Sequence, residues 1–110
     1  MRKLTVLDYL EETEEKYFQK TAVITEKRKY TYKELTESAR IIAFAIVNEL
    51  AGYRHKPIML FMDKGFECFS SMFGVLYSGN SYVPMDIKTP IERLMHILDT
   101  MGSGIIITTT

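Results

Sequence analysis

Apolar residues recur at the three-to-four-residue spacing of a helix in four separate stretches of the chain. In the first stretch Thr5 is placed to cap a helix, and the apolar stripe that follows consists of Val6, Leu10, Thr13 and Tyr17. An acidic run lies among these positions, made of Glu11, Glu12, Glu14 and Glu15. We interpret this run as a solvated helix face rather than as a functional patch.

The second helical stretch has a stronger start signal, because Thr31 and Glu34 form the Thr-x-x-Glu pattern of a capping box. Its buried stripe is expected to consist of Leu35, Ala39, Ile42, Ile46 and Leu50. Gly52 stands just past its end, where a left-handed residue is favoured. Before this helix, residues 21–25 and 29–32 carry β-branched and aromatic side chains on either side of a polar turn, which predicts a small hairpin.

The second half of the chain alternates between strands and helices. Residues 57–62 are continuously apolar, which is typical of a strand covered on both faces in a parallel sheet. A helix is expected from Gly65 to Gly79, with an apolar stripe formed by Phe66, Phe69, Phe73, Leu76 and Tyr77. Residues 81–85 predict another strand, which should end at Pro84 or lie at a sheet edge because proline lacks a donor.

The last helix has its start signal at residues 89–92, with Thr89 predicted at the cap, Pro90 at the first helical position and Glu92 at the third. Its buried face is expected to consist of Ile91, Leu94, Met95, Leu98 and Met101, and Gly102 should end it. Residues 105–109 predict a final strand. Strands that alternate with helices indicate β-α-β crossovers. We therefore predict one α/β unit over residues 1–110: a largely parallel sheet with helices on both faces, plus an N-terminal helix and a small β-hairpin.

Composition narrows the possible environment and partners. The 110 residues are 46% hydrophobic and 25% charged, which indicates a globular chain. Fourteen basic and fourteen acidic side chains cancel, so no electrostatic footprint for nucleic acid is present. The longest apolar run, residues 57–62, is far shorter than the ~20 residues that span a bilayer, so we expect no membrane partner. With no signal peptide and a single cysteine, Cys68, we expect a soluble, cytoplasmic protein.

Phosphate and metal sites find little support in the sequence. It contains neither G-x-G-x-x-G nor a Walker loop, and Gly102 and Gly104 follow a helix instead of opening one. His55, His96 and Cys68 lack the clustered spacing of metal ligands. We expect both histidines to be solvated and Cys68 to be a small buried hydrophobe with no lowered pKa.

Candidate nucleophiles and carboxylates also have structural interpretations. Ser70 and Ser71 lie mid-helix, without the strand-turn-helix elbow of a nucleophile. Asp63 and Asp86 each follow a strand, where ligand-binding residues of open α/β sheets often lie, although Asp86 could equally order the turn before Thr89. We therefore assign no catalytic, cofactor-binding or metal-binding residue to this chain.

Three stretches of the chain, residues 30–35 (YTYKEL), 76–86 (LYSGNSYVPMD) and 89–94 (TPIERL), follow one another as a succession of motifs. In this order they resemble the amino-acid adenylation domains of adenylate-forming enzymes. Residues 30–35 resemble their first core motif, L-[TS]-Y-x-E-L, and residues 76–86 resemble the second, L-K-A-G-x-A-Y-V-P-[IL]-D. Residues 89–94 then match Y-P-x-E-R-[IL]. The departures are Tyr30 for leucine, Tyr77 and Ser78 for Lys-Ala, Ser81 for alanine, and residues 87–89 for a more proline-rich turn. The form of the second motif is more similar to amino-acid activators, including D-alanine–carrier-protein ligases, than to acyl-CoA synthetases or luciferases.

The resemblance implies a parent enzyme that joins ATP and an amino acid into an aminoacyl-adenylate and loads the thiol of a phosphopantetheinyl carrier protein. ATP and Mg²⁺ would be required by the parent. The family's phosphate loop, substrate pocket, ribose-binding aspartate and C-terminal lysine lie beyond residue 110, so none is carried over. The resemblance thus implies an inactive N-terminal fragment whose first partner is the remainder of the adenylation domain. A free-standing α/β binding or dimerisation module is the alternative.

The last predicted strand suggests how the chain could associate with another polypeptide. A strand of central type at residues 105–110 would leave an unpaired edge, which finished proteins usually cover or blunt. The isolated chain is therefore expected to self-associate through that edge, or to need an exchanged element.

Overall fold

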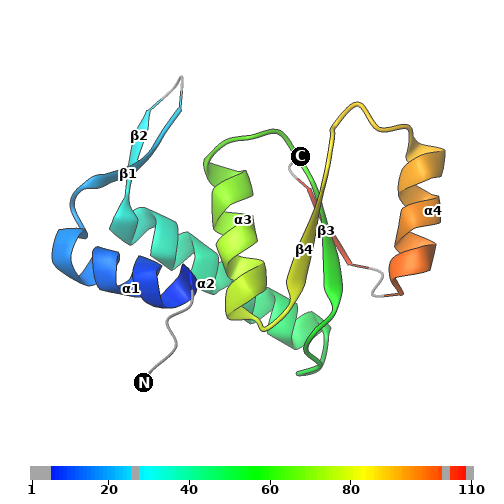
Figure 1. Ribbon diagram of the computed structural model, residues 1–110, viewed down its shortest axis with the longest axis horizontal. Coiled ribbons are helices and arrows are strands. Elements are labelled where there is room, and N and C mark those ends of the chain that lie inside the picture. The colour runs from blue at the N-terminus through cyan, green and yellow to red at the C-terminus, as the bar shows by residue number, and fades with distance from the viewer. Residues whose placement is uncertain (1–5, 26–27, 103–104, 109–110) are drawn as a thin grey trace.

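The computed structural model describes residues 6–25, 28–102 and 105–108 (Figure 1). Its elements follow the predicted order: α1 (Val6–Tyr17), β1 (Thr21–Ile24), β2 (Lys29–Thr31), α2 (Tyr32–Glu49), β3 (Pro57–Phe61), α3 (Phe66–Tyr77), β4 (Ser81–Met85), α4 (Ile91–Met101) and β5 (Ile106–Thr108). The expected cap at Thr5 and the glycine at position 104 lie outside the described residues.

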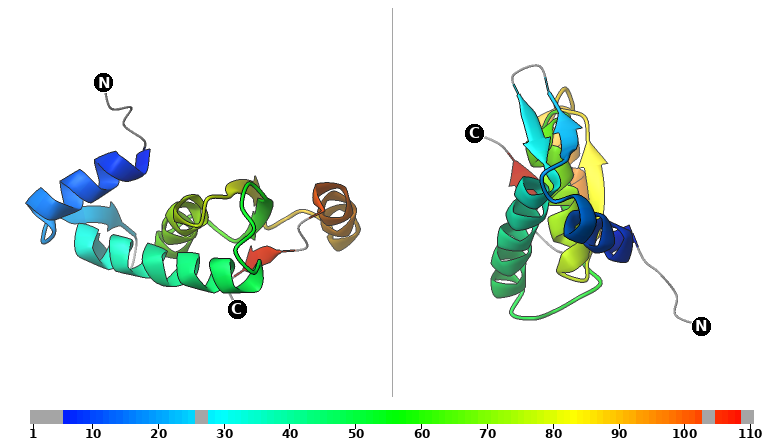
Figure 2. Two further views of the ribbon diagram at one scale, coloured as in Figure 1. Left: turned by 90° about the horizontal axis from the view of Figure 1, so that it is seen from below. Right: turned by 90° about the vertical axis from the view of Figure 1, so that its left-hand side faces the viewer.

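The three later strands form a parallel sheet in the order β4-β3-β5, and β1 and β2 form a separate antiparallel hairpin. Helices α2 and α3 lie on one side of the parallel sheet, whereas α4 lies on the other side (Figures 1 and 2). This arrangement confirms the predicted α/β fold with helices on both faces. It follows from two crossovers that leave the sheet in opposite directions, β3-α3-β4 and β4-α4-β5.

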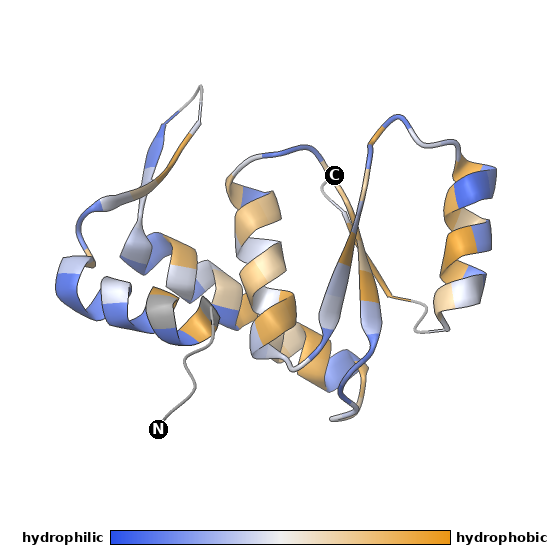
Figure 3. Ribbon diagram, in the orientation of Figure 1, coloured by the Kyte–Doolittle hydropathy of each residue, from blue (hydrophilic) through white to orange (hydrophobic). Residues whose placement is uncertain are grey.

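The central strand β3 is buried on both faces, as its unbroken apolar sequence predicted. Ile58 and Leu60 point into a core that they form with Ile46 of α2 and Val75 of α3. Met59 points to the opposite face and is also fully buried. Figure 3 shows how apolar residues gather on α3 and the strands, whereas α1 is mostly hydrophilic.

A second core lies at the N-terminal end of the molecule. Leu10 of α1, Val23 of β1 and Leu35 of α2 form its buried centre, and aromatic side chains surround them. Helix α2 has 18 residues and is therefore about 27 Å long, so it reaches from this core to the one beneath the sheet. Leu35 and Ile46 of this single helix belong to the two different cores.

Helices α2 and α3 approach each other closely at Gly74. A Cβ atom built on Gly74 would lie 2.7 Å from Ile42 Cγ2 and 2.9 Å from the carbonyl oxygen of Ala39. Both distances are shorter than van der Waals contact, so only glycine fits between the helices here. The α2 residues on this side that are fully or nearly buried, Ala39 and Ala43, are correspondingly small.

The capping box of α2 is present as predicted. Thr31 Oγ1 accepts a hydrogen bond from the Glu34 N–H at 3.2 Å, and Glu34 Oε1 accepts one from the Thr31 N–H at 3.1 Å. At the other end of α2, Ala51 as well as Gly52 has a positive φ, at 51° and 84°. The left-handed turn therefore begins one residue before the glycine that was expected to provide it.

The start of α4 was predicted one residue too early. Pro90 is the N-cap, with φ −61° and ψ 148°, and its carbonyl oxygen accepts from the N–H groups of Arg93 and Leu94. No side chain caps this helix, so Thr89 does not play the predicted role. The Thr89 N–H instead donates to the Asp86 carbonyl oxygen and closes the preceding turn at 3.0 Å.

Four apolar residues that were predicted to be buried are exposed. Tyr17, Phe69, Ile91 and Met95 are between 42% and 72% accessible. On α1 and α4 they share a stripe with a buried residue, Leu10 and Leu94 respectively. On α3 the buried residues are Ser70, Ser71, Gly74 and Val75, none of which belongs to the predicted stripe. The periodicity therefore located the buried face of α4 but overestimated its width, because neighbouring elements of this chain cover only part of that face. On α3 it was wrong about the most buried face, since the predicted stripe is only partly covered.

Candidate functional site

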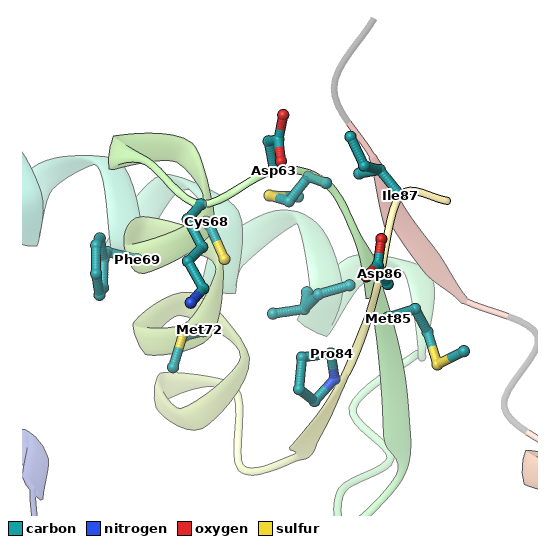
Figure 4. Close-up of a pocket in the computed structure, with 11 residues that line it drawn as sticks. Asp63, Cys68, Phe69, Met72, Pro84, Met85, Asp86 and Ile87 are labelled. Carbon is teal, nitrogen blue, oxygen red and sulfur yellow. The ribbon is translucent and has the colours of Figure 1, made fainter. Parts of the chain in front are cut away.

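A pocket opens at the carboxyl ends of β3 and β4 (Figure 4). It has a volume of about 960 Å³. Its walls come from both strands, the loops that follow them and one side of α3, namely Leu60, Met62, Asp63, Lys64, Cys68, Phe69, Met72, Pro84, Met85, Asp86 and Ile87. Most of these side chains are apolar or carry sulfur.

The topology explains why a hollow forms at this place. Strands β3 and β4 are neighbours, but the chain leaves β3 toward α3 on one face and leaves β4 toward α4 on the other. Ligand sites of open α/β sheets occur at such switch points, because the two diverging loops leave a crevice between them. In the sequence, Asp63 and Asp86 each follow a strand, and this position puts both at the carboxyl end of the sheet, where the pocket opens.

Both carboxylates line this pocket, but they differ in their surroundings. Figure 4 shows Asp63 and Asp86 at the same end of the hollow. Asp86 Oδ1 accepts a hydrogen bond from the Lys88 N–H at 2.8 Å, so this side chain orders the turn before α4. Asp63 is exposed at the rim. The interpretation of Asp86 as a turn residue is thus confirmed, and the same residue also lines the pocket.

Cys68 lines the pocket from α3 and is half-buried. Burial raises the pKa of its thiol, and the nearby Lys64 ammonium opposes this effect only in part. The thiol therefore stays protonated near neutral pH, which makes it a poor nucleophile. The expectation that Cys68 has no lowered pKa is confirmed, although a basic residue does lie close to it.

The other candidate residues have structural roles or are exposed. Ser70 is buried inside α3, and its hydroxyl donates to the Phe66 carbonyl oxygen at 2.9 Å. Ser71 is buried beside it. His55 and His96 are exposed, as predicted. Among the described residues there is no group of three histidine, cysteine or carboxylate side chains that could hold a metal ion. None of the helices in the described part of the chain combines the length and apolar character needed to cross a bilayer.

The second motif is held together by a hydrogen-bond network that the sequence did not reveal. Asn80 is buried, and its Oδ1 accepts from the Lys56 N–H at 2.8 Å at the entrance to β3. Its Nδ2 donates to the Ser78 hydroxyl, also at 2.8 Å. Gly79, between them, has a φ of 83° and ends α3. This part of the motif therefore connects the end of α3 to the adjacent strands β3 and β4.

One acidic residue was wrongly assigned to a solvated face. Glu11 of α1 is half-buried and accepts hydrogen bonds from Tyr77 of α3 and Arg40 of α2. These two bonds hold the pKa of the Glu11 carboxyl below its usual value, with Tyr77 contributing most. The signal for this contact lay in Tyr77 rather than in the acidic run, because a buried tyrosine hydroxyl needs a partner.

The comparison with protein families agrees with this fold and these motifs. The model of the AMP-binding enzyme family matches residues 10–110. Because this is nearly the whole chain, the protein belongs to the AMP-binding enzyme family. Within the family, it corresponds to an N-terminal segment of the adenylation domains of nonribosomal peptide synthetases, as its relatives indicate.

Two curated relatives illustrate this relationship. Gramicidin S synthase 1 from Brevibacillus brevis is 30% identical over 107 residues, which are 97% of this chain and 10% of the synthase. Tyrocidine synthase 1 from Brevibacillus parabrevis is 31% identical over 99 residues, which are 89% of this chain and 9% of that synthase. This chain therefore spans about a tenth of the length of these relatives.

Solved structures share the fold. The nonribosomal peptide synthetase FmoA3 superposes with a TM-score of 0.90 at 25% identity, over 97% of this chain and 11% of that one. A benzoate CoA ligase from Burkholderia xenovorans LB400 superposes with a TM-score of 0.81 at 27% identity, over 91% of this chain and 20% of the ligase. The fold is thus common to both kinds of enzyme, and the curated sequence relatives favour the peptide synthetases.

Proposed function

We propose that this chain is the N-terminal part of an ATP-dependent ligase that activates an amino acid as its adenylate and passes it to the thiol of a carrier protein. The supporting observation is the family match over residues 10–110, together with a peptide synthetase that is 30% identical over 97% of the chain. The order of the two core motifs along the chain supports the same assignment.

In this proposal the chain supplies a scaffold and no catalytic group. Its motif residues cap α2, end α3 and order the turn after β4. The fit of ATP and Mg²⁺ to the pocket is poor, because a triphosphate requires several N–H donors or cations and Lys64 is accompanied by two carboxylates. We therefore place ATP, Mg²⁺, the amino acid and the carrier protein at the remainder of the enzyme, and expect the chain alone to be inactive.

A hybrid enzyme tests the proposal. In this hybrid, residues 10–110 replace the matching segment of gramicidin S synthase 1, and ATP–pyrophosphate exchange is measured with each of the twenty amino acids. We expect amino-acid-dependent exchange by the hybrid and none by the chain alone. Exchange by the chain alone would contradict the scaffold role. A folded, monodisperse hybrid without exchange would favour the alternative of a free-standing binding or dimerisation module.

A further inference from the structure

The loop between α2 and β3 lies at the opposite end of the sheet from the pocket. It leads into the amino end of β3, at the bottom of Figure 1, whereas the pocket opens at the carboxyl ends of the strands. Four consecutive residues of this loop are exposed, namely Tyr53, Arg54, His55 and Lys56, and we call them the basic loop. The Tyr53 side chain is 70% accessible. The basic loop is therefore a surface separate from the pocket.

Hydrogen bonds fix the backbone of the basic loop at both of its ends. The Tyr53 N–H donates to the Leu50 carbonyl oxygen at 3.0 Å, at the end of α2. The His55 N–H donates to the Gly79 carbonyl oxygen at 2.9 Å, just past the end of α3. The Lys56 N–H donates to the buried asparagine described above at 2.8 Å. A loop that is already ordered loses little conformational freedom when a partner binds to it.

The geometry of the loop holds its arginine in place. His55 has a φ of 60°, a left-handed conformation that is uncommon for residues with a side chain and that is concentrated at functional sites. A Cβ atom built on Gly79 would lie 3.1 Å from Arg54 Cδ and 3.3 Å from Arg54 Cγ. The aliphatic stem of Arg54 therefore lies against the glycine of the second motif. Because the residue as a whole is exposed, its guanidinium extends into solvent from a stem that is held in position.

The chain does not neutralise the positive charges of the basic loop. Among the residues that the structure describes, neither Arg54 nor Lys56 has an ion-pair partner, whereas Arg28 and Arg40 each pair with a glutamate. A guanidinium can bind a carboxylate through two parallel hydrogen bonds. Tyrosine and arginine are also the residue types enriched at protein–protein interfaces and at their energetic centres. The loop thus fits a partner that supplies carboxylates beside an apolar group.

We propose that the basic loop is a docking site for an acidic segment of a partner polypeptide. Two carboxylates of that segment pair with Arg54 and Lys56, and an apolar side chain between them lies on the Tyr53 ring. Nucleic acids and anionic membranes fit less well, because they engage clusters of about four to ten basic side chains and this loop has only these two. This docking goes beyond the proposed function, and it places the partner at the end of the sheet away from the pocket.

Titration of a short fluorescent peptide, followed by anisotropy, tests the proposal. The probe has two glutamates that flank a leucine, and its control has glutamines in their place. We expect the double variant Arg54→Glu/Lys56→Glu to bind the probe at least about tenfold more weakly than the wild type, and Tyr53→Ala to bind it several-fold more weakly. Arg54→Gln/Lys56→Gln should weaken binding in the same direction, and it replaces the charge-reversal variant should that one not fold.

A matched control reverses two charges at the other end of α2. Lys29 and Lys33 are exposed there, and α2 is about 27 Å long, well beyond the ~10 Å over which charges interact at moderate salt. Lys29→Glu/Lys33→Glu should therefore change the dissociation constant by less than about twofold. Equal weakening by the two pairs of charge reversals overturns the proposal. Equal binding of the glutamine peptide, or no measurable binding of the probe to the wild type, overturns it as well.

Two further titrations separate the remaining alternatives. Tighter binding of a thymidine oligonucleotide or of phosphatidylserine vesicles than of the peptide, lost in Arg54→Glu/Lys56→Glu, assigns the loop to those ligands and overturns the proposal. In the hybrid described above, the peptide should bind with similar affinity. Loss of binding there would show that the rest of the domain covers the loop, which also overturns the proposal. A hybrid that binds the peptide but lacks ATP–pyrophosphate exchange contradicts the proposed function alone.

Discussion

The Tyr77 hydroxyl donates a hydrogen bond to Glu11 Oε1 at 2.5 Å, and this bond joins two residues that are 66 positions apart in the chain. Arg40 Nη2 donates to the same oxygen at 2.8 Å. Three helices, α1, α2 and α3, thus meet at one carboxylate. Burial and the bond to Glu11 raise the pKa of Tyr77, because both favour its neutral hydroxyl.

Tyr77→Phe should lower the free energy of unfolding by about 1 kcal/mol. Hydrogen bonds to charged groups contribute roughly 1.5–3 kcal/mol, and partial exposure of Glu11 reduces this value. Urea denaturation measures the change. In the matched double-mutant cycle, Tyr77→Phe should have a smaller effect in a Glu11→Gln background. Equal effects in both backgrounds would show that the bond does not contribute.

The contribution of Glu11 should depend on pH in a defined direction. Its folded-state pKa lies below the ordinary value of 4.5, so its stabilising effect is present above that value and is lost as the pH falls through the folded-state pKa. The difference in unfolding free energy between the wild type and Glu11→Gln should therefore be constant near neutrality and shrink below pH 4.5. A pH series of urea denaturation curves measures it. A difference that grows on acidification would mean that the assigned direction is wrong.

Gly74→Ala should destabilise the protein by roughly 1–3 kcal/mol, the range for overpacked cores. The added Cβ would lie 2.7 Å from Ile42 Cγ2 and 2.9 Å from a backbone oxygen of α2, which cannot move aside as a side chain can. Thermal unfolding followed by circular dichroism measures the loss. Adding Ile42→Ala should relieve only the side-chain part of the clash. An unchanged melting temperature for Gly74→Ala would show that the helices can separate freely.

Ala51→Gly should stabilise the protein by about 0.5–1 kcal/mol. Ala51 has a φ of 51°, where an L-residue is strained by roughly 1–2 kcal/mol and glycine is not, although glycine loses more entropy on folding. Chemical denaturation measures the gain. The matched control is Ala45→Gly within α2, which should lose about 1 kcal/mol because glycine is a poor helix former. Destabilisation by both substitutions would contradict the strain at Ala51.

The Tyr30 ring stacks on Phe66 with centroids 3.9 Å apart and planes 6° from parallel. The Arg28 guanidinium lies 4.3 Å from the centre of the Tyr30 ring. The first core motif of adenylation domains, which residues 30–35 resemble, has leucine at this position. Tyr30→Leu therefore introduces the residue of that motif but removes the stack. We expect a loss of about 0.5–1.5 kcal/mol, measured by chemical denaturation. The effect should largely disappear in a Phe66→Leu background; a full effect there would mean that stacking does not contribute.

The parts of the fold that could be predicted from the sequence are those with a local physical cause. The capping box of Thr31 and Glu34 involves residues three apart, so its pattern was sufficient to locate the start of α2. Pro84 lacks a donor wherever it lies, and this property predicted that β4 would end there or lie at a sheet edge. In the described residues β4 continues to Met85 and takes the edge position. The unbroken apolar sequence of β3 predicted its burial on both faces.

The parts that could not be predicted depend on which distant residues meet. Glu11 and Tyr77 carry no pattern that pairs them, since their contact depends on how α1 and α3 pack. Similarly, the exposure of Ile91 depends on how far α4 is covered by the rest of the chain. The candidate pocket is an intermediate case. The sequence placed Asp63 and Asp86 at strand ends, but only the order of the strands in the sheet shows that the two residues line the same pocket.

The long helix α2 has a consequence for cooperativity. Leu35 anchors it in the core near the hairpin, and Ile46 anchors it in the core beneath the sheet. Neither core can lose this helix without exposing apolar residues of the other, so the two halves should melt together in one transition. A protein with two small cores can in this way behave as a single folding unit.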